Sequence, residues 1–161
     1  MSSSGIPVGG VRLTERWFAT LQMSSRPGPM PVKWREDLHH RWIVVVVSDP
    51  YNTTEWATAM KEVLAHRDAH PPLRLLIDAR YCSAPLTPFV RRAVEQWAIE
   101  EKQLRRARIA IVVGDDASYG MARMAEIAVD VRHLPFTLRG FRDWDHAGQW
   151  LAEMSEAQGS L

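Results

Sequence analysis

Five consecutive β-branched residues, Ile43 to Val47, constrain the fold of this chain more than any other feature. Isoleucine and valine favour extended backbone, because branching at Cβ restricts their side chains in a helix. A strand alternates its side chains between the two faces of a sheet, so an unbroken apolar run requires cover on both faces. The run therefore predicts a strand inside a sheet that is covered by helices.

Strand and helix signals alternate along the rest of the chain. Residues 32–36 and 41–48 are expected to form an antiparallel hairpin with a turn at 37–38. Further strands are predicted at 73–79, 108–113 and 135–139, and helices at 52–66, 87–104, 117–129 and from Asp143 onward. This β-β-α-β-α-β-α-β-α order predicts an α/β domain with a mostly parallel mixed sheet, an N-terminal β-hairpin and four helices.

Polar residues mark where the predicted helices begin. Asn52 is followed three residues later by Glu55, the arrangement of a capping box. Thr87 precedes a proline at the first helical position. The turn at 114–116 has one glycine and two acids, which is typical of a capped helix start and not of a phosphate loop with several glycines. Asp143 is expected to cap the last helix.

Large apolar side chains on the predicted helices indicate the core. Met121 and Met124 are expected to fill it from the third helix. Three of the seven tryptophans fall on inner helix faces: Trp56, Trp97 and Trp150. Trp17, Trp34 and Trp144 fit no core position as well, and exposed aromatic residues favour an interface or a ligand.

The α/β domain is predicted to cover residues 32–155. Residues 1–31 carry clusters of Ser, Gly and Pro near both ends. We interpret them as an N-terminal extension, either loosely attached or docked through Trp17 and Phe18. Residues 156–161 form a short C-terminal tail.

Charge, cysteine content and hydropathy point to a cytoplasmic protein. Twenty Lys and Arg face nineteen Asp and Glu, which favours neither nucleic acid nor an acidic membrane surface as a partner. The single cysteine cannot form an internal disulfide, which fits a reducing compartment. No apolar run approaches the roughly 20 residues that cross a bilayer, and the N-terminus lacks the features of a signal peptide.

Three stretches of sequence carry a family resemblance. The first is an apolar strand that ends on an acid, Leu-Leu-Ile-Asp at 75–78. The second is the strand Arg-Ile-Ala-Ile-Val-Val at 108–113 with Gly-Met-Ala-Arg-Met at 120–124 after it. The third covers residues 141–151 and reads Phe-Arg-Asp-Trp-Asp-His-Ala-Gly-Gln-Trp-Leu. With the order of elements, they resemble the STAS-like superfamily of bacterial anti-sigma-factor antagonists, and best its short STAS-like or lipid-transfer-like proteins. The resemblance covers about 32–155 and implies a STAS-like fold and a regulatory role.

The resemblance also implies a working surface in the loop after the third strand. In the anti-sigma-factor antagonists this loop reads Asp-Ser-Ser-Gly or similar and its serine is phosphorylated. Here the loop at 80–86 lacks the glycine, and Ser83 is its only serine and the candidate phosphosite. The expected ligand or partner surface consists of Asp78, Arg80, Tyr81, Cys82, Ser83 and Thr87.

Catalytic roles for these residues compete with simpler ones. Asp78 could reach a ligand beyond the carboxyl ends of the strands, or it could accept hydrogen bonds from the backbone of the following loop. Cys82 and Ser83 could act as nucleophiles, but the sequence places no base beside them and contains no Gly-x-Ser-x-Gly motif. A buried spectator cysteine is the simpler interpretation.

No metal or cofactor is expected. His39 and His40 are neighbours, and neighbours on a strand point to opposite faces. His66 and His70 have helical spacing but stand where a helix ends, and no third ligand accompanies them.

These patterns favour a non-catalytic binding or regulatory module that acts through protein–protein contacts or self-association. One alternative is a carrier of a small apolar or lipid-like ligand, with a pocket beneath the helix at 87–104 or at 120–129. The other alternative is an enzyme built around Asp78 and Cys82.

Overall fold

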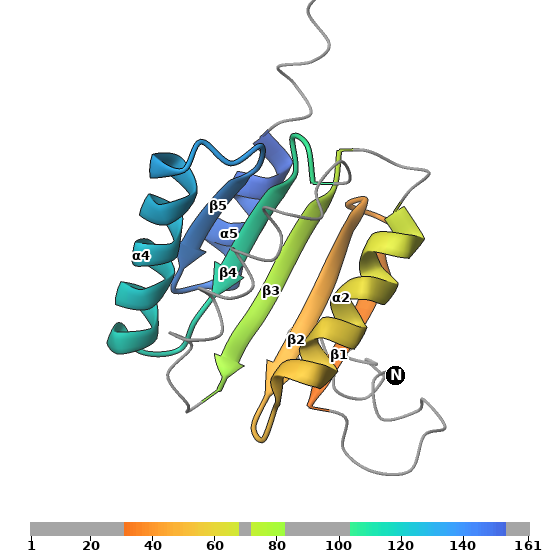
Figure 1. The fold of residues 1–161 in the computed structure, drawn as a ribbon, viewed down its shortest axis with the longest axis horizontal. Helices are drawn as coiled ribbons and strands as arrows, with labels where there is room; N and C mark the ends of the chain where they lie inside the picture. Colours follow the sequence, from red (N-terminus) through yellow and green to blue (C-terminus); the bar gives the residue numbers. More distant parts are fainter. Residues whose placement is uncertain (1–30, 68–71, 83–103, 154–161) are drawn as a thin grey trace, which may run out of the picture.

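A computed structural model describes residues 31–67, 72–82 and 104–153, which form a five-stranded sheet with three helices (Figure 1). The elements are β1 (Val32–Asp37), β2 (Trp42–Ser48), α2 (Thr53–Arg67), β3 (Arg74–Tyr81), β4 (Arg108–Val112), α4 (Asp116–Val131), β5 (Thr137–Phe141) and α5 (Trp144–Ala152). Strands lie in chain order, β1 antiparallel to β2 and the others parallel. The predicted α/β class, hairpin and mixed sheet are confirmed. The helix predicted at 87–104 lies outside the described residues, apart from Leu104.

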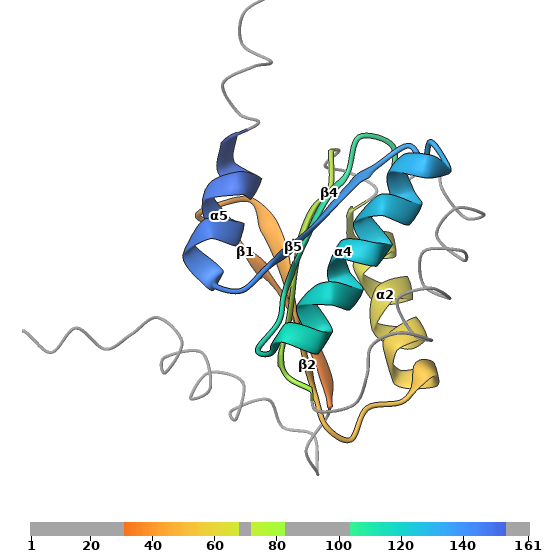
Figure 2. The same ribbon diagram turned by 90° about the vertical axis from the view of Figure 1, so that its left-hand side faces the viewer.

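The helices divide between the two faces of the sheet. Figure 2 shows α2 and α4 on one face and α5 alone on the other. The connections from β2 to β3 and from β4 to β5 step in the same direction along the sheet. Because such parallel crossovers are right-handed, their helices must share a face. Among the described helices, α5 follows the last strand and covers the opposite face.

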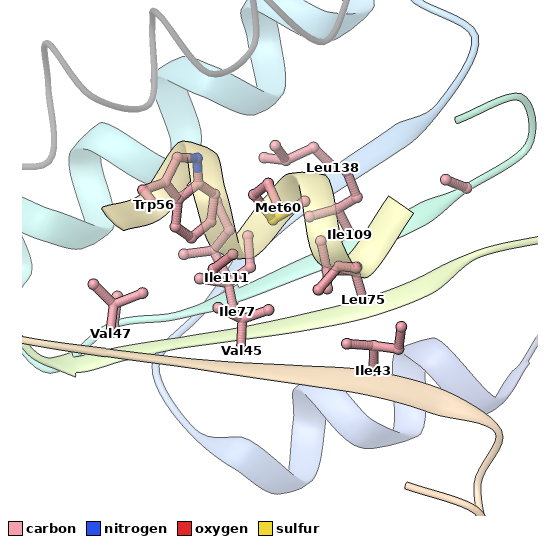
Figure 3. Packing of buried hydrophobic residues seen from close by; sticks show 14 of the residues in the cluster. Ile43, Val45, Val47, Trp56, Met60, Leu75, Ile77, Ile109, Ile111 and Leu138 are labelled. Atoms are coloured by element: carbon pink, nitrogen blue, oxygen red, sulfur yellow. The ribbon is translucent and has the colours of Figure 1, made fainter. Parts of the chain in front are cut away.

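The apolar run in β2 is buried on both faces, as predicted. Val45 and Val47 point toward α2 and join the larger core cluster, whereas Val44 points toward α5. Figure 3 shows how the larger cluster is built from side chains of the strands and α2. Its labelled members are Ile43, Val45, Val47, Trp56, Met60, Leu75, Ile77, Ile109, Ile111 and Leu138.

The smaller core cluster lies between the sheet and α5. Trp42, Val44, Leu76, Ala110, Val112, Ala147, Trp150 and Leu151 form it. Asp143 is the N-cap of α5 and accepts a hydrogen bond from the His146 backbone N–H at 2.9 Å, as predicted. The Trp42 ring of β2 reaches α5 at Gly148: a Cβ at this glycine would be 3.3 Å from Cη2 of Trp42.

Two strands end later than predicted. β5 ends at Phe141 instead of Arg139. β3 continues through Arg80 and Tyr81, so the predicted loop start at Arg80 is wrong. The extension is possible because Tyr81 pairs with Ser48 across an irregularity in β2, which keeps the two strands together beyond their apolar part.

Some side chains lie elsewhere than their patterns predicted. Met124 is 64% exposed instead of filling the core. The buried residues of α4 are Ser118, Ala122, Ala125 and Val129. Trp34 packs against the larger core cluster, and its indole N–H donates to Glu62 at 2.9 Å. Among the described helices, none has the length and apolar character that crossing a membrane would require.

Candidate interaction surface at the carboxyl ends of the strands

The carboxyl ends of β2, β3, β4 and β5 lie at one end of the sheet because these four strands are parallel. This end is the usual location of sites in parallel α/β sheets. The structure places four predicted site residues there: Asp78, Arg80, Tyr81 and Cys82. Ser83 and Thr87 lie outside the described residues.

Asp78 and Arg80 form a two-pronged ion pair on β3. Arg80 Nε donates to Asp78 Oδ1 at 2.9 Å and Nη2 donates to Oδ2 at 2.8 Å. The Arg80 backbone N–H also donates to Oδ1, at 3.2 Å. The two side chains can meet because residues two apart on a strand share a face.

The Asp78 carboxylate is buried, with 3% of the residue exposed. Its neighbours across the sheet are Val46 on β2 and Val112 on β4, which leaves an apolar surrounding. A buried carboxylate requires a partner, and the guanidinium of Arg80 supplies it. The hydrogen bonds to Asp78 in turn raise the pKa of Arg80. Asp78 therefore lies beneath the surface and fixes the side chain above it.

The guanidinium of Arg80 lies near two aromatic rings. Its guanidinium carbon lies 5.6 Å from the ring centre of Tyr81 and 5.6 Å from that of Trp144, the first residue of α5. Tyr81 is 43% exposed. Arginine, tyrosine and tryptophan are the residue types that contribute most to binding energy at protein interfaces. The sequence placed Trp144 outside the core, but its position beside Arg80 depends on the topology.

Cys82 has the properties of a structural thiol. It is buried, and among the described residues its Sγ hydrogen bonds only to the Val47 carbonyl, which accepts at 3.4 Å. Burial, followed by the charges of Asp49 and Asp78, raises the pKa of the thiol to about 12. A nucleophilic cysteine needs the opposite environment, one that stabilises the thiolate. Among the described residues, the surroundings of Cys82 therefore disfavour the thiolate.

The loops after β4 and β5 complete this end of the sheet. Gly114 lies directly against β3: a Cβ at this position would be 2.9 Å from the Arg80 carbonyl oxygen. Asp116 forms an ion pair with Arg142, which follows β5. Arg142 also lies over the ring of Tyr119, 4.7 Å from its centre. Arg142 was not predicted as a site residue, because its only signal in the sequence is its place between a strand and a helix cap.

Asp115 caps α4 as the pattern at 114–116 predicted. Its carboxylate accepts hydrogen bonds from the Ser118 backbone N–H and hydroxyl, each at 2.8 Å. These bonds lower the pKa of Asp115.

Two of the histidines considered as metal ligands pair with acids of β1. His40 pairs with Asp37 and stacks on Trp42, whereas His66 pairs with Glu36 at 2.8 Å. In the part of the chain that the structure describes, no three His, Cys, Asp or Glu side chains are placed to hold a metal ion.

A carrier was expected to have a ligand pocket beneath the helix at 87–104 or at 120–129. A Cβ at Gly140 of β5 would lie 2.7 Å from the Cβ of Ala122, so helix and strand are in direct contact there. The other predicted pocket, beneath the helix at 87–104, falls almost entirely outside the described residues.

Comparisons with family models, curated proteins and solved structures find no match to this chain.

Proposed function

We propose that this chain is a non-catalytic, STAS-like binding module that contacts a protein partner through the carboxyl-edge surface, defined as Arg80, Tyr81, Arg142 and Trp144. One observation carries the proposal: a buried aspartate fixes the Arg80 guanidinium 5.6 Å from the ring centres of Tyr81 and Trp144. An arginine fixed in this way loses less side-chain entropy on binding than a free one. The Arg80 side chain loses its conformational entropy when the domain folds, before any partner binds.

The buried ion pair supports a binding role more than a stabilising one. A hydrophobic pair of similar volume often stabilises a protein as well as a buried ion pair does. The neighbours of Asp78 are valines, so an apolar residue would fit its position. The ion pair gives the surface an oriented guanidinium, which a hydrophobic pair could not provide.

The regulatory part of the proposal concerns Ser83. It follows the buried Cys82 by one residue and is the only serine in the loop that the family resemblance marks as regulatory. A phosphate there would add about two negative charges close in sequence to Arg80. Phosphorylation of Ser83 is therefore proposed to weaken partner binding by competing for this guanidinium.

Site-specific photocrosslinking tests the proposed surface. Benzoylphenylalanine at Tyr81 is expected to capture one discrete partner in the source cell. The matched control carries the same group at Leu38, which is 80% exposed in the β1–β2 turn at the other end of the sheet. An excess of unlabelled wild-type chain should suppress the crosslink, and an excess of the Tyr81→Ala chain should not. Equal crosslinking from both positions, or equal competition by both chains, would refute the proposal.

A further inference from the structure

The outer side of α4 carries large apolar side chains that nothing in the described fold covers. Met124 is 64% exposed, Ile127 56% and Val131 71%. Gly120 lies on the same side, and a Cβ there would meet nothing within 4 Å. We call these four residues the outer α4 stripe. The stripe is separate from the carboxyl-edge surface, and its role is independent of the proposed function.

The outer α4 stripe lies opposite the buried side of the helix. Each of its members follows one of the buried residues Ser118, Ala122, Ala125 and Val129 by two positions. Two residues correspond to about 200° around a helix of 3.6 residues per turn. The stripe therefore points directly away from the sheet. The buried side consists mostly of small side chains, so α4 has its larger apolar residues facing outward.

The spacing of the outer α4 stripe is that of a helix that packs on another helix. Its positions are separated by four, three and four residues, the heptad spacing of coiled-coil seams. We propose that the stripe is a self-association surface on which two copies of this chain pair α4 against α4 in antiparallel orientation.

The shapes of the side chains fit an antiparallel pair. In such a pair, Met124 meets Ile127 of the second copy and Gly120 meets Val131. Two medium-sized side chains then pack in each central layer, and the smallest residue faces a branched one in each outer layer. A parallel pair would instead bring two glycines together and leave a gap in that layer.

The charges beside the stripe favour the same orientation. Arg123 and Asp130 flank it on one side, and Met121 and Ala128 flank it on the other. In an antiparallel pair the charged sides meet, which brings Arg123 near Asp130 of the second copy, twice by symmetry. In a parallel pair each charged side would face an apolar one.

Arg123 is available for this contact at little cost. It now pairs with Glu126 on its own helix, with Nη1 2.6 Å from Oε1, and its side chain is 47% exposed. Exposed ion pairs of this kind contribute little to stability, so Arg123 can turn toward Asp130 of the second copy.

The expected association is weak. α4 has 16 residues, and two helices of this length bury less than the roughly 1,200 Å² typical of stable complexes. A dissociation constant on the order of ten micromolar is therefore expected.

Sedimentation velocity of the full chain across the micromolar range tests the pairing. Wild type is expected to shift from monomer to dimer with concentration. Ile127→Glu should abolish the shift, and the control Leu38→Glu, at an exposed residue away from α4, should leave it unchanged. Arg123→Asp and Asp130→Arg should each weaken the association roughly tenfold, and the double variant should restore it. Urea denaturation of each variant establishes that the monomer still folds.

Three results would each overturn the inference. Wild type could remain monomeric throughout, in which case the stripe serves another partner. Ile127→Glu could destabilise the monomer without changing its mass, in which case another segment of this chain covers the stripe. The charge-exchanged double variant could associate as weakly as the single variants, in which case the antiparallel pairing is wrong.

Discussion

The contact between α4 and β5 makes a quantitative prediction about the substitution Gly140→Ala. The new Cβ would lie 2.7 Å from the Cβ of Ala122, whereas ordinary van der Waals contact begins at 3.4 Å. Both atoms are attached directly to backbone and neither can rotate away, so α4 and β5 must separate. Overpacking of this kind costs about 1–3 kcal/mol. Alanine is better than glycine in a strand by about 0.5–1 kcal/mol, so the middle values of the two ranges give an expected net loss of about 1 kcal/mol.

The substitution Ala122→Gly tests this explanation, because it removes the methyl group that the new Cβ at Gly140 would overlap. Alone it should cost about 1 kcal/mol through the helix propensity of glycine and a further 0.8 kcal/mol or so through the loss of a buried methyl group. In the double variant the methyl group added to the strand fills the space left by the one removed from the helix, and the overlap disappears. The double variant should therefore lie within about 0.5 kcal/mol of wild type, because the gain in the strand offsets the loss in the helix.

Urea denaturation followed by tryptophan fluorescence measures all three variants, at a concentration that keeps the chain monomeric. Gly120→Ala is the matched control: it makes the same chemical change on α4 where the new Cβ meets nothing, and it should stabilise the protein by about 1 kcal/mol. The reasoning is refuted if Gly140→Ala is as stable as wild type. It is equally refuted if the loss in the double variant equals the sum of the single losses.

The ion pairs and the thiol lead to three further expectations. Arg80→Leu should lower the free energy of unfolding by about 3 kcal/mol, because it leaves Asp78 buried without its partner. The double variant Asp78→Val/Arg80→Leu should recover most of this loss in the same urea assay. The hydrogen bond with Asp143 raises the pKa of His146 above 6.5, and the bonds from the His146 side chain and backbone lower the pKa of Asp143. The pair should therefore stabilise α5 most between the ordinary pKa values of the two groups. The stabilisation from His146 is lost as pH rises through its raised pKa, and the stabilisation from Asp143 is lost as pH falls through its lowered pKa. Titration of His146 by NMR checks this, and Asp143→Asn should return its pKa to about 6.5. Cys82 should react with a thiol reagent at pH 8 only through unfolding, since a pKa of about 12 leaves about one thiol in ten thousand ionised. Labelling of the folded chain at the rate of the urea-unfolded chain would contradict the structure.

The inner strands β2, β3 and β4 could be predicted from the sequence because burial on both faces leaves a continuous apolar run. Ile43 to Val47 has no polar residue to interrupt it, and the strand appeared where expected. The last two residues of β3 were missed because Arg80 and Tyr81 resemble the start of a loop. They remain in the strand through pairing with Ser48, a contact from 33 positions earlier in the chain that no local pattern contains.

Met124 shows why the inner side of a helix cannot always be read from its apolar residues. Large side chains normally mark the buried side. On α4 the buried side must approach Gly140 of β5 closely, so small residues such as Ala122 occupy it. Prediction of the candidate site from the sequence is limited in a similar way. Asp78 and Arg80 can be paired from their spacing on a strand, but Trp144 joins them only because α5 covers the face on which they lie.

The chain-ordered arrangement of the strands has a consequence for biosynthesis. In this sheet each strand after β1 pairs with the strand that precedes it in the chain, so no strand has to insert between two strands that are already formed. The sheet can therefore grow from a single edge as the polypeptide leaves the ribosome, starting with the β1–β2 hairpin. Contacts between neighbours in sequence also shorten the loops that must close, which favours fast folding. The exposed growing edge passes from β2 to β3 to β4 until β5 is added, and a ribosome that pauses before β5 would leave the apolar strand β4 open to aggregation.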